Sequence, residues 1–280
     1  MKTTTTARAE HADDGQARVL ERARAKRFAI DAVEPLEGKV SAAEWEARVD
    51  LAAAYRLIAR HGWDDMLSTH ISARVPDEDG TFLLNPYGVL FQQVTASSLI
   101  KVDFSGKLLC ATPFLVNPAA IVFHAPIFEA RSDVHSALHL HSTAGVAVAT
   151  QEHGLLPITQ RALYFLPILA YHDYEGIGLE DSEREAVARD LGDKWALILR
   201  NHGTLTVGRS VAQAYTYMYF LERACQYQVA ALAGGAPIRQ LSADVIDLVP
   251  QQATHFAHAG LLEWPALLAT LDAEGAGFRG

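Results

Sequence analysis

Signals that start helices alternate along this chain with short apolar runs. The signals are three capping boxes, in which a serine is followed three residues later by Glu or Gln: Ser41 to Glu44, Ser182 to Glu185 and Ser210 to Gln213. Such a box satisfies free N–H groups in the first turn of a helix. The apolar runs between them have the length of strands. Because strands and helices alternate irregularly, the sequence predicts an α/β fold: a single three-layer domain with a mixed central β-sheet flanked by helices.

The expected elements follow from these signals and from glycine stops at Gly62 and Gly234. Helices are expected over residues 41–61, 118–131, 143–151, 182–191 and 210–233. Strands are expected over residues 70–75, 81–85, 134–142, 195–199 and 204–207. Residues 94–109 are expected to form a short helix and a hairpin, and residues 162–174 to be irregular or extended.

The chain has 280 residues and is 50% hydrophobic, which is enough for the core of one large domain. Residues 1–40 are polar and weakly patterned, so we expect a flexible N-terminal extension, with a helix near Ala17–Phe28. Residues 41–240 are expected to form the main domain and residues 241–280 a C-terminal helical addition.

Composition excludes several classes of function. A net charge of −9 argues against a nucleic-acid groove or an anionic membrane surface as partner. No apolar run reaches the roughly 18 residues of a membrane span, and the N-terminus lacks the apolar core of a signal peptide. Cys110 and Cys225 are not in a metal-ligand spacing. We therefore expect a cytoplasmic protein that acts on a small molecule without an organic cofactor.

Three histidines carry the clearest chemical signal. His139 and His141 are separated by one residue in an apolar run, and alternation along a strand places both on the same side. His202 lies in a turn between two further apolar runs. A facial set of three imidazoles leaves coordination positions open, as catalytic metal sites do.

The order of several segments resembles the class II aldolase/adducin superfamily. These segments are HISARV, FLLNPYG, VTASSLIKVD, RSDVHSALHLHS, GLLPIT, AYHDYEG and ALILRNHGTLTVG, between about residue 45 and residue 235. The resemblance implies a class II aldolase-like fold, a homotetramer, and a divalent metal (Zn, Fe or Mn) near a subunit interface. It implies that His139, His141 and His202 hold the metal, which acts as a Lewis acid.

The sequence departs from the aldolases of this superfamily at the residues that handle protons and phosphate. Their acid/base glutamate falls on Ala120, and alanine cannot move a proton. Their phosphate-binding serines fall on Pro118 and Ala119, and the phosphate loop reads Thr69-His70-Ile-Ser72. Because these phosphate-binding donors are lost and no Lys or Arg replaces them, we expect a non-phosphorylated substrate. The adducin-like branch shares these departures.

Several residues are candidates for the missing roles. His70, His124 and Tyr164 are candidates to replace the catalytic base. Arg161 suits a substrate carboxylate, because its planar fork binds two oxygens, although a salt bridge at a subunit contact explains it equally well. Tyr87 is a candidate to touch the polar end of a substrate.

Three functions remain open from the sequence. The first is a divalent-metal-dependent enzyme that cleaves or forms a C–C bond next to a carbonyl in a small hydroxy- or oxo-acid. The second is a non-heme Fe(II) oxygenase that oxidatively decarboxylates an aromatic 2-oxo acid of the 4-hydroxyphenylpyruvate type, since three histidines also suit Fe(II). The third is a non-catalytic, adducin-like assembly protein.

Overall fold

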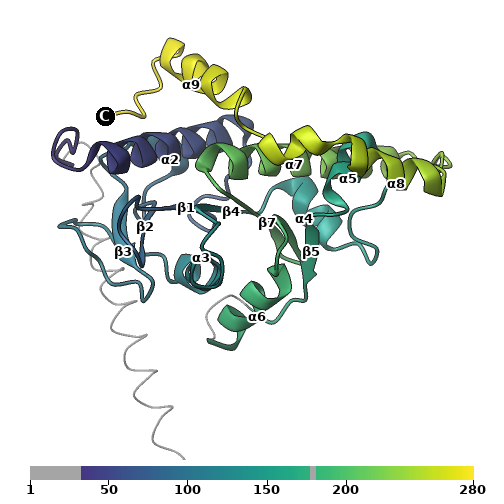
Figure 1. The fold of residues 1–280 in the computed structure, drawn as a ribbon, viewed down its shortest axis with the longest axis horizontal. Helices are drawn as coiled ribbons and strands as arrows, with labels where there is room; N and C mark the ends of the chain where they lie inside the picture. The colour runs from purple at the N-terminus through teal and green to yellow at the C-terminus, as the bar shows by residue number, and fades with distance from the viewer. Residues whose placement is uncertain (1–32, 177–180) are drawn as a thin grey trace, which may run out of the picture.

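The structure is a computed structural model that describes residues 33–176 and 181–280. A seven-stranded sheet crosses the molecule in the order β3-β2-β1-β4-β7-β6-β5 (Figure 1). Neighbouring strands pair antiparallel except β5 and β6, which are parallel, so the sheet is mixed as predicted. The strands are β1 (His70–Arg74), β2 (Thr81–Leu84), β3 (Ile100–Asp103), β4 (Ser136–Leu140), β5 (Leu169–His172), β6 (Ala196–Leu199) and β7 (Gly203–Gly208).

Helices cover both faces of the sheet, which confirms the three-layer arrangement. In Figure 1, α3 and α6 lie below the sheet, while α2 and α7 lie above it. The helices are α2 (Ala42–His61), α3 (Pro118–Ala130), α4 (Thr143–Ala149), α5 (Gln160–Phe165), α6 (Asp181–Leu191), α7 (Val211–Ala233), α8 (Ala243–Gln252) and α9 (Glu263–Ala273), with 3₁₀ turns at η2 (Phe91–Gln93) and η3 (Thr254–His258).

Two of the predicted capping boxes act at the helix starts where they were expected. The side chain of Ser41 accepts a hydrogen bond from the backbone N–H of Glu44, and Ser210 does the same for Gln213. Gly62 ends α2 with φ 66°, a left-handed conformation that glycine adopts without strain. The side chain of Ser182 lies outside the described residues.

The strand β4 lies at the centre of the sheet and carries the first histidine. All five of its residues are buried, because helices pack on both of its faces. Its neighbour β1 is antiparallel, and in this register His70 lies directly opposite His139. The sheet therefore brings together two histidines that are far apart in the sequence.

Other segments differ from the sequence expectation. Within residues 162–174, expected to be irregular or extended, the structure has the end of α5 before β5, because Thr159 caps that helix by accepting from the N–H of Ala162. The expected strand at 134–142 is shorter, so His141 lies just past the end of β4. The expected helix within 1–32 lies outside the described residues. The C-terminal segment is helical in part, and its end returns to the core, where Phe278 is buried and its carbonyl accepts from the N–H of Ala96.

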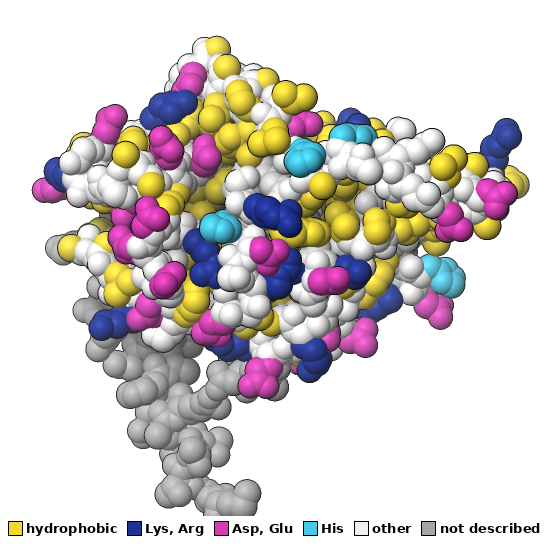
Figure 2. Space-filling model, viewed as in Figure 1, with side chains coloured by type: hydrophobic (Ala, Val, Ile, Leu, Met, Phe, Trp, Pro, Cys, Tyr) yellow, Lys and Arg dark blue, Asp and Glu magenta, His cyan; other side chains and the backbone are white. Residues whose placement is uncertain are grey.

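The surface mixes acidic and basic side chains, as Figure 2 shows for one face. The C-terminal segment also exposes apolar side chains, with Leu261 70% and Leu262 87% exposed. Within residues 33–176 and 181–280, no helix combines the length and the apolar character that crossing a membrane requires.

Candidate metal centre

The imidazoles of His139 and His141 meet at the end of β4. Their Nε2 atoms are 2.9 Å apart, and the two rings are nearly perpendicular. Alternation along the strand, continued one residue past its end, places both side chains on the same side of the backbone. The spacing of the two residues therefore converges two nitrogens on one point, as the sequence predicts.

His202 reaches the same point from the turn between β6 and β7. The preceding residue, Asn201, has φ 58°, a left-handed conformation that asparagine tolerates better than most residues. Gly203 follows, and a Cβ there would lie 2.4 Å from the carbonyl oxygen of Leu140 and 3.1 Å from Cδ2 of His141. The Asn-His-Gly sequence is thus explained by its geometry. Asparagine tolerates the left-handed turn, and glycine leaves room for the Leu140 carbonyl oxygen and the His141 ring.

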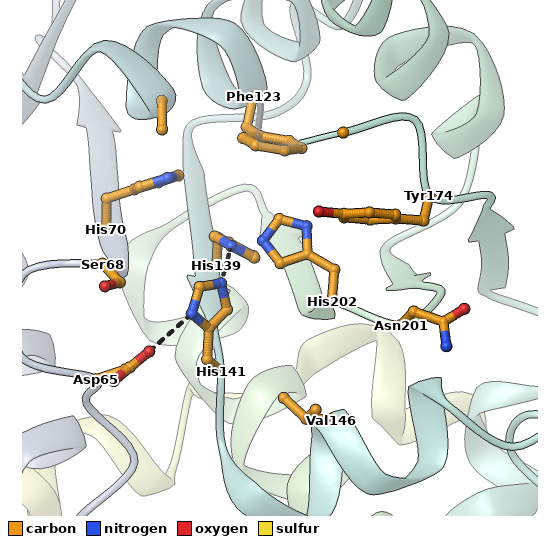
Figure 3. Close-up of a pocket in the computed structure, with 12 residues that line it drawn as sticks. Asp65, Ser68, His70, Phe123, His139, His141, Val146, Tyr174, Asn201 and His202 are labelled. Atoms are coloured by element: carbon orange, nitrogen blue, oxygen red, sulfur yellow. Dashed lines mark hydrogen bonds and ion pairs between the residues drawn. The ribbon is translucent and has the colours of Figure 1, made fainter. Parts of the chain in front are cut away.

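Together the three histidines form a cluster that fits a metal ion. One ligand atom from each of His139, His141 and His202 can be chosen so that all lie within 4.8 Å of one another. Figure 3 shows the three rings facing one another in a pocket.

Hydrogen bonds to the outer nitrogens fix the protonation of this cluster. The carbonyl oxygen of Thr204 lies 3.1 Å from Nδ1 of His139, and a carboxylate oxygen of Asp65 lies 3.1 Å from Nδ1 of His141. Both partners only accept, so both Nδ1 atoms carry the proton of the neutral ring. The two Nε2 atoms then present lone pairs to each other, which repel unless a cation lies between them. The donor set therefore fits a divalent metal, with the outer partners that metal-bound histidines usually have.

Burial keeps the imidazoles of His139 and His202 neutral, as metal ligands must be. Burial, reinforced by the neighbouring histidines, holds the pKa of His139 well below its usual value. Burial, then the nearby His141 and His172, lowers the pKa of His202 to about 4. His139 and His202 can therefore bind a cation at neutral pH without first losing a proton.

A cavity of about 560 Å³ opens in front of the cluster. The ring of Phe123 stacks on His139 at 5.3 Å and meets His202 edge-on at 5.6 Å, so one wall is apolar. Tyr174 lies on the other side of His202, with ring centroids 6.2 Å apart. The lining residues are Asp65, Ser68, His70, Ala119, Phe123, His139, His141, Val146, Tyr174, Gly176, Asn201 and His202.

A second histidine pair, His70 and His124, extends from the cavity wall into the protein interior. Nδ1 of His70 is 3.0 Å from Nε2 of His124, and Nδ1 of His124 is 2.6 Å from the hydroxyl oxygen of Ser72. All three side chains are fully buried. Burial lowers the pKa of both histidines, that of His124 to about 3 and that of His70 well below its usual value. Of the three, His70 lines the cavity.

Comparison with known proteins decides the family. Residues 49–229 match the family described as "Class II Aldolase and Adducin N-terminal domain".

The chain belongs to the class II aldolase and adducin family.

Relatives of two kinds support this membership. A Caulobacter vibrioides protein named "Putative aldolase class 2 protein" is 51% identical over 245 residues, covering 87% of this chain and 95% of that protein. Alpha-adducin of Rattus norvegicus is 43% identical over 194 residues, but the match covers only 26% of the adducin.

Solved structures of the family share the fold. An aldolase II superfamily protein of Pseudomonas syringae has a TM-score of 0.84 and 44% identity, covering 88% of this chain and 99% of that one. An L-fuculose 1-phosphate aldolase of Glaciozyma antarctica has a TM-score of 0.75 and 27% identity, covering 85% of this chain and 93% of that one. The mixed sheet with flanking helices is therefore that of class II aldolases.

The other candidates from the sequence fall in different places. His70 lines the cavity, and His124 supports it from behind. Arg161 and Tyr164 lie on α5, and neither lines the cavity of this chain. The guanidinium of Arg161 instead lies 4.0 Å from the ring centroid of Phe220.

Tyr87 also falls outside the cavity lining. Its backbone N–H donates to the carbonyl of Leu115, which ties the turn at 85–88 to the segment that leads into α3. The single chain therefore does not bring Tyr87, Arg161 or Tyr164 to the three histidines.

Sequence reasoning missed several functional neighbours. Asp65 follows α2 in a segment without a motif, and its hydrogen bond to His141 joins residues 76 positions apart. Phe123 precedes His124 on an apolar helix and reads as a core residue. Ser72 belongs to the segment that resembles the phosphate loop, but its side chain turns inward to His124. In each case the role depends on a partner from a distant element.

Proposed function

We propose that this protein is a divalent-metal-dependent lyase that cleaves or forms a C–C bond next to a carbonyl in a small, non-phosphorylated hydroxy- or oxo-acid. The observation that carries the proposal is the 2.9 Å approach of the Nε2 atoms of His139 and His141, whose Nδ1 atoms each face an acceptor. At the coarser level, its family includes proteins described as class 2 aldolases, one of them 51% identical.

In this proposal His139, His141 and His202 hold the metal. When bound, the metal supplies a Lewis acid that polarises a carbonyl. Phe123 packs against two of these rings and keeps water from that side. His70 lies on the same wall, beside His139, with ring centroids 5.0 Å apart. A substrate oxygen at the metal would therefore lie between the histidine nitrogens on one side and the ring of Phe123 on the other.

The lining of the cavity favours an acid without a phosphate group. Among the described residues that line it, none is Lys or Arg, so no permanently charged cationic side chain there pairs with a phosphate dianion. Ala119 stands on the wall where the family's aldolases carry a phosphate-binding serine. A carboxylate of an oxo-acid would instead bind the cation directly, because Arg161 lies elsewhere.

The missing glutamate bears on the type of cleavage. Ala120 is fully buried and offers no proton acceptor. A retro-aldol reaction must first remove a hydroxyl proton, whereas a 3-oxo acid loses CO₂ without that step, because the electron pair of the broken C–C bond moves onto its own carbonyl oxygen as an enolate forms. Within the proposed class we therefore favour decarboxylation or another cleavage that starts without proton abstraction.

The test is metal content followed by anaerobic turnover. The protein, purified without added metal, is analysed for Zn, Mn and Fe, and then screened by NMR against hydroxy- and oxo-acids in the absence of oxygen. We expect about one metal per chain, its loss in His139→Ala, and turnover without oxygen. Turnover that requires Fe and oxygen would favour the oxygenase, for which none of the relatives named above gives support.

An adducin-like assembly role is the second candidate, because alpha-adducin is 43% identical over the matched region. The same experiment separates the two functions. A protein that binds no Zn, Mn or Fe at any concentration tested, and whose stability does not change in His139→Ala, would contradict the lyase proposal and favour assembly.

We also propose a homotetramer, supported by the family resemblance and by the exposed Leu261 and Leu262. In an assembly, Arg161 and Tyr164 would act only if they reach the cavity of a neighbouring copy. Sedimentation equilibrium measures the assembly state. A monomer at micromolar concentration would reject both the homotetramer and a role of Arg161 and Tyr164 in a neighbouring cavity.

A further inference from the structure

One nitrogen on the cavity wall lacks a partner. Nε2 of His70 is buried and, among the described residues, has no hydrogen-bond partner. A buried polar atom without a partner destabilises the folded protein. The same side chain lines the cavity, although Nε2 itself is closed off from solvent, so a ligand atom that completes this hydrogen bond must pack directly against the wall.

The proton on this nitrogen depends on the residues behind it. The chain Ser72 Oγ, His124 Nδ1, His124 Nε2 and His70 Nδ1 is continuous, with contacts of 2.6 and 3.0 Å. With neutral rings, two arrangements satisfy both contacts. Either the hydroxyl donates and both rings carry the proton on Nε2, or the hydroxyl accepts and both rings carry it on Nδ1.

The Ser72 hydroxyl decides between these arrangements. Within the described residues the hydroxyl oxygen of Ser72 forms a hydrogen bond only with His124, and the side chain is fully buried. If this hydroxyl accepted from His124, its own hydrogen would be buried without an acceptor. If it donates, every proton in the chain has an acceptor except the one on His70 Nε2, which is at the cavity wall.

We propose that His70 is a fixed hydrogen-bond donor, whose neutral ring presents Nε2–H to a substrate oxygen beside the three-histidine site. Ser72 and His124 are positioning residues that hold this tautomer. A nitrogen that already carries a proton cannot accept one, so His70 stabilises negative charge on oxygen and does not serve as the missing base. The inference rests on the proposed function for the identity of the ligand, but the tautomer itself does not.

This role fits the chemistry of C–C cleavage next to a carbonyl. Electrons from the breaking bond move onto the carbonyl oxygen, and a donor already aimed at that oxygen stabilises the charge without reorganising. Removal of one such donor typically lowers kcat about 10²–10³-fold. The rigid support from β1 and α3 makes His70 suitable for this task.

The first test reads the tautomer directly in the metal-free protein. Long-range ¹H–¹⁵N correlations of ¹⁵N-histidine-labelled protein at pH 8 show which ring nitrogen carries the proton. We expect His70 and His124 to be protonated on Nε2. Protonation of His70 on Nδ1 would overturn the proposal. Because this measurement uses the wild-type protein, it does not depend on whether a variant folds.

Variants then test the positioning role. Ser72→Ala removes the donor, so we expect the His70 resonances to shift toward a mixture of both tautomers. Ser136→Ala is the matched control, because it removes another fully buried serine hydroxyl, one that donates to the carbonyl of Ser72 and does not touch His124. It is expected to leave the His70 pattern unchanged. An unchanged pattern in Ser72→Ala would reject the role of Ser72.

Ligand binding tests the donor. Pyruvate, a simple oxo-acid, is titrated into the zinc-loaded protein. We expect roughly tenfold weaker binding in His70→Ala and partial recovery in His70→Gln, whose amide N–H reaches a similar position. Equal affinity in all three proteins would contradict the donor role. Failure to bind zinc would instead reject the proposed function and leave the tautomer result standing.

Discussion

The carboxylate of Asp65 is expected to strengthen metal binding through His141. It accepts from Nδ1 of His141 at 3.1 Å, which raises the basicity of Nε2 and fixes the ring. Loss of such an outer partner typically weakens metal binding about 10–100-fold. The Asp65 side chain is 52% exposed, so water screens its charge and the effect should lie at the lower end. For Asp65→Asn we expect a dissociation constant about tenfold higher, or about 1.4 kcal/mol.

The measurement is a competition titration with a zinc chelator of known affinity. Asp65→Asn keeps an oxygen that can accept from His141 but removes the charge, whereas Asp65→Ala removes both. We therefore expect the affinity to fall in the order wild type, Asp65→Asn, Asp65→Ala, with the melting temperature of the metal-free protein little changed.

A neighbouring residue provides the control for charge alone. Asp64→Asn makes the same change of formal charge next in the sequence, and no hydrogen bond from Asp64 to His141 is present. It should change the dissociation constant less than twofold. If Asp65→Asn and Asp64→Asn bind zinc equally well, the carboxylate does not act through His141, and the reasoning is wrong.

Three further predictions concern stability. Gly203→Ala would place a Cβ 2.4 Å from the Leu140 carbonyl oxygen, so we expect a loss of about 3 kcal/mol in urea unfolding, whereas Gly234→Ala, with nothing within 4 Å, should be nearly neutral. The pKa of His124 is about 3 against 6.5 unfolded, so the unfolded chain binds more protons between these values. Protonation of His124 alone should therefore lower the free energy of unfolding of the metal-free protein by about 1.5 kcal/mol from pH 6.5 to pH 5. Because His70, His139 and His202 add losses of the same sign, His124→Gln should make the total loss smaller by that amount in urea titrations at the two pH values. Arg161→Ala should cost about 1 kcal/mol through its contact with Phe220 and leave zinc affinity unchanged; weaker zinc binding would place Arg161 at a metal site.

Local patterns predicted the elements that carry the site. Ser41 and Ser210 start their helices because a serine hydroxyl and the N–H three residues later are fixed neighbours. Alternation along β4 put His139 and His141 on one side, because successive side chains of a strand point to opposite faces. The α5 helix was missed because its cap, Thr159, has no glutamate or glutamine three residues on, and Ala162 stands there.

The arrangement around the histidines could not be predicted from local patterns. His70 and His124 were chosen one by one as candidates to replace a base, and no local pattern indicates that their rings touch. Their contact joins β1 to α3 across 54 positions. Arg161 was chosen for its planar fork and Tyr164 as a candidate base, and neither property says whether a short helix faces the cavity or packs on α7.

The sequence by itself determined the fold, the three histidines and the absence of the family's glutamate, because each depends on residues that are neighbours or on a motif in order. Only the tertiary structure decided where the protons lie. A histidine tautomer is set by the atom opposite each ring nitrogen, and here those atoms belong to Asp65, Thr204 and Ser72, which other elements bring to the site. The sequence therefore identified the histidines, and the fold brought each ring nitrogen to the partner on which our proposed metal ligands and the proposed His70 donor depend.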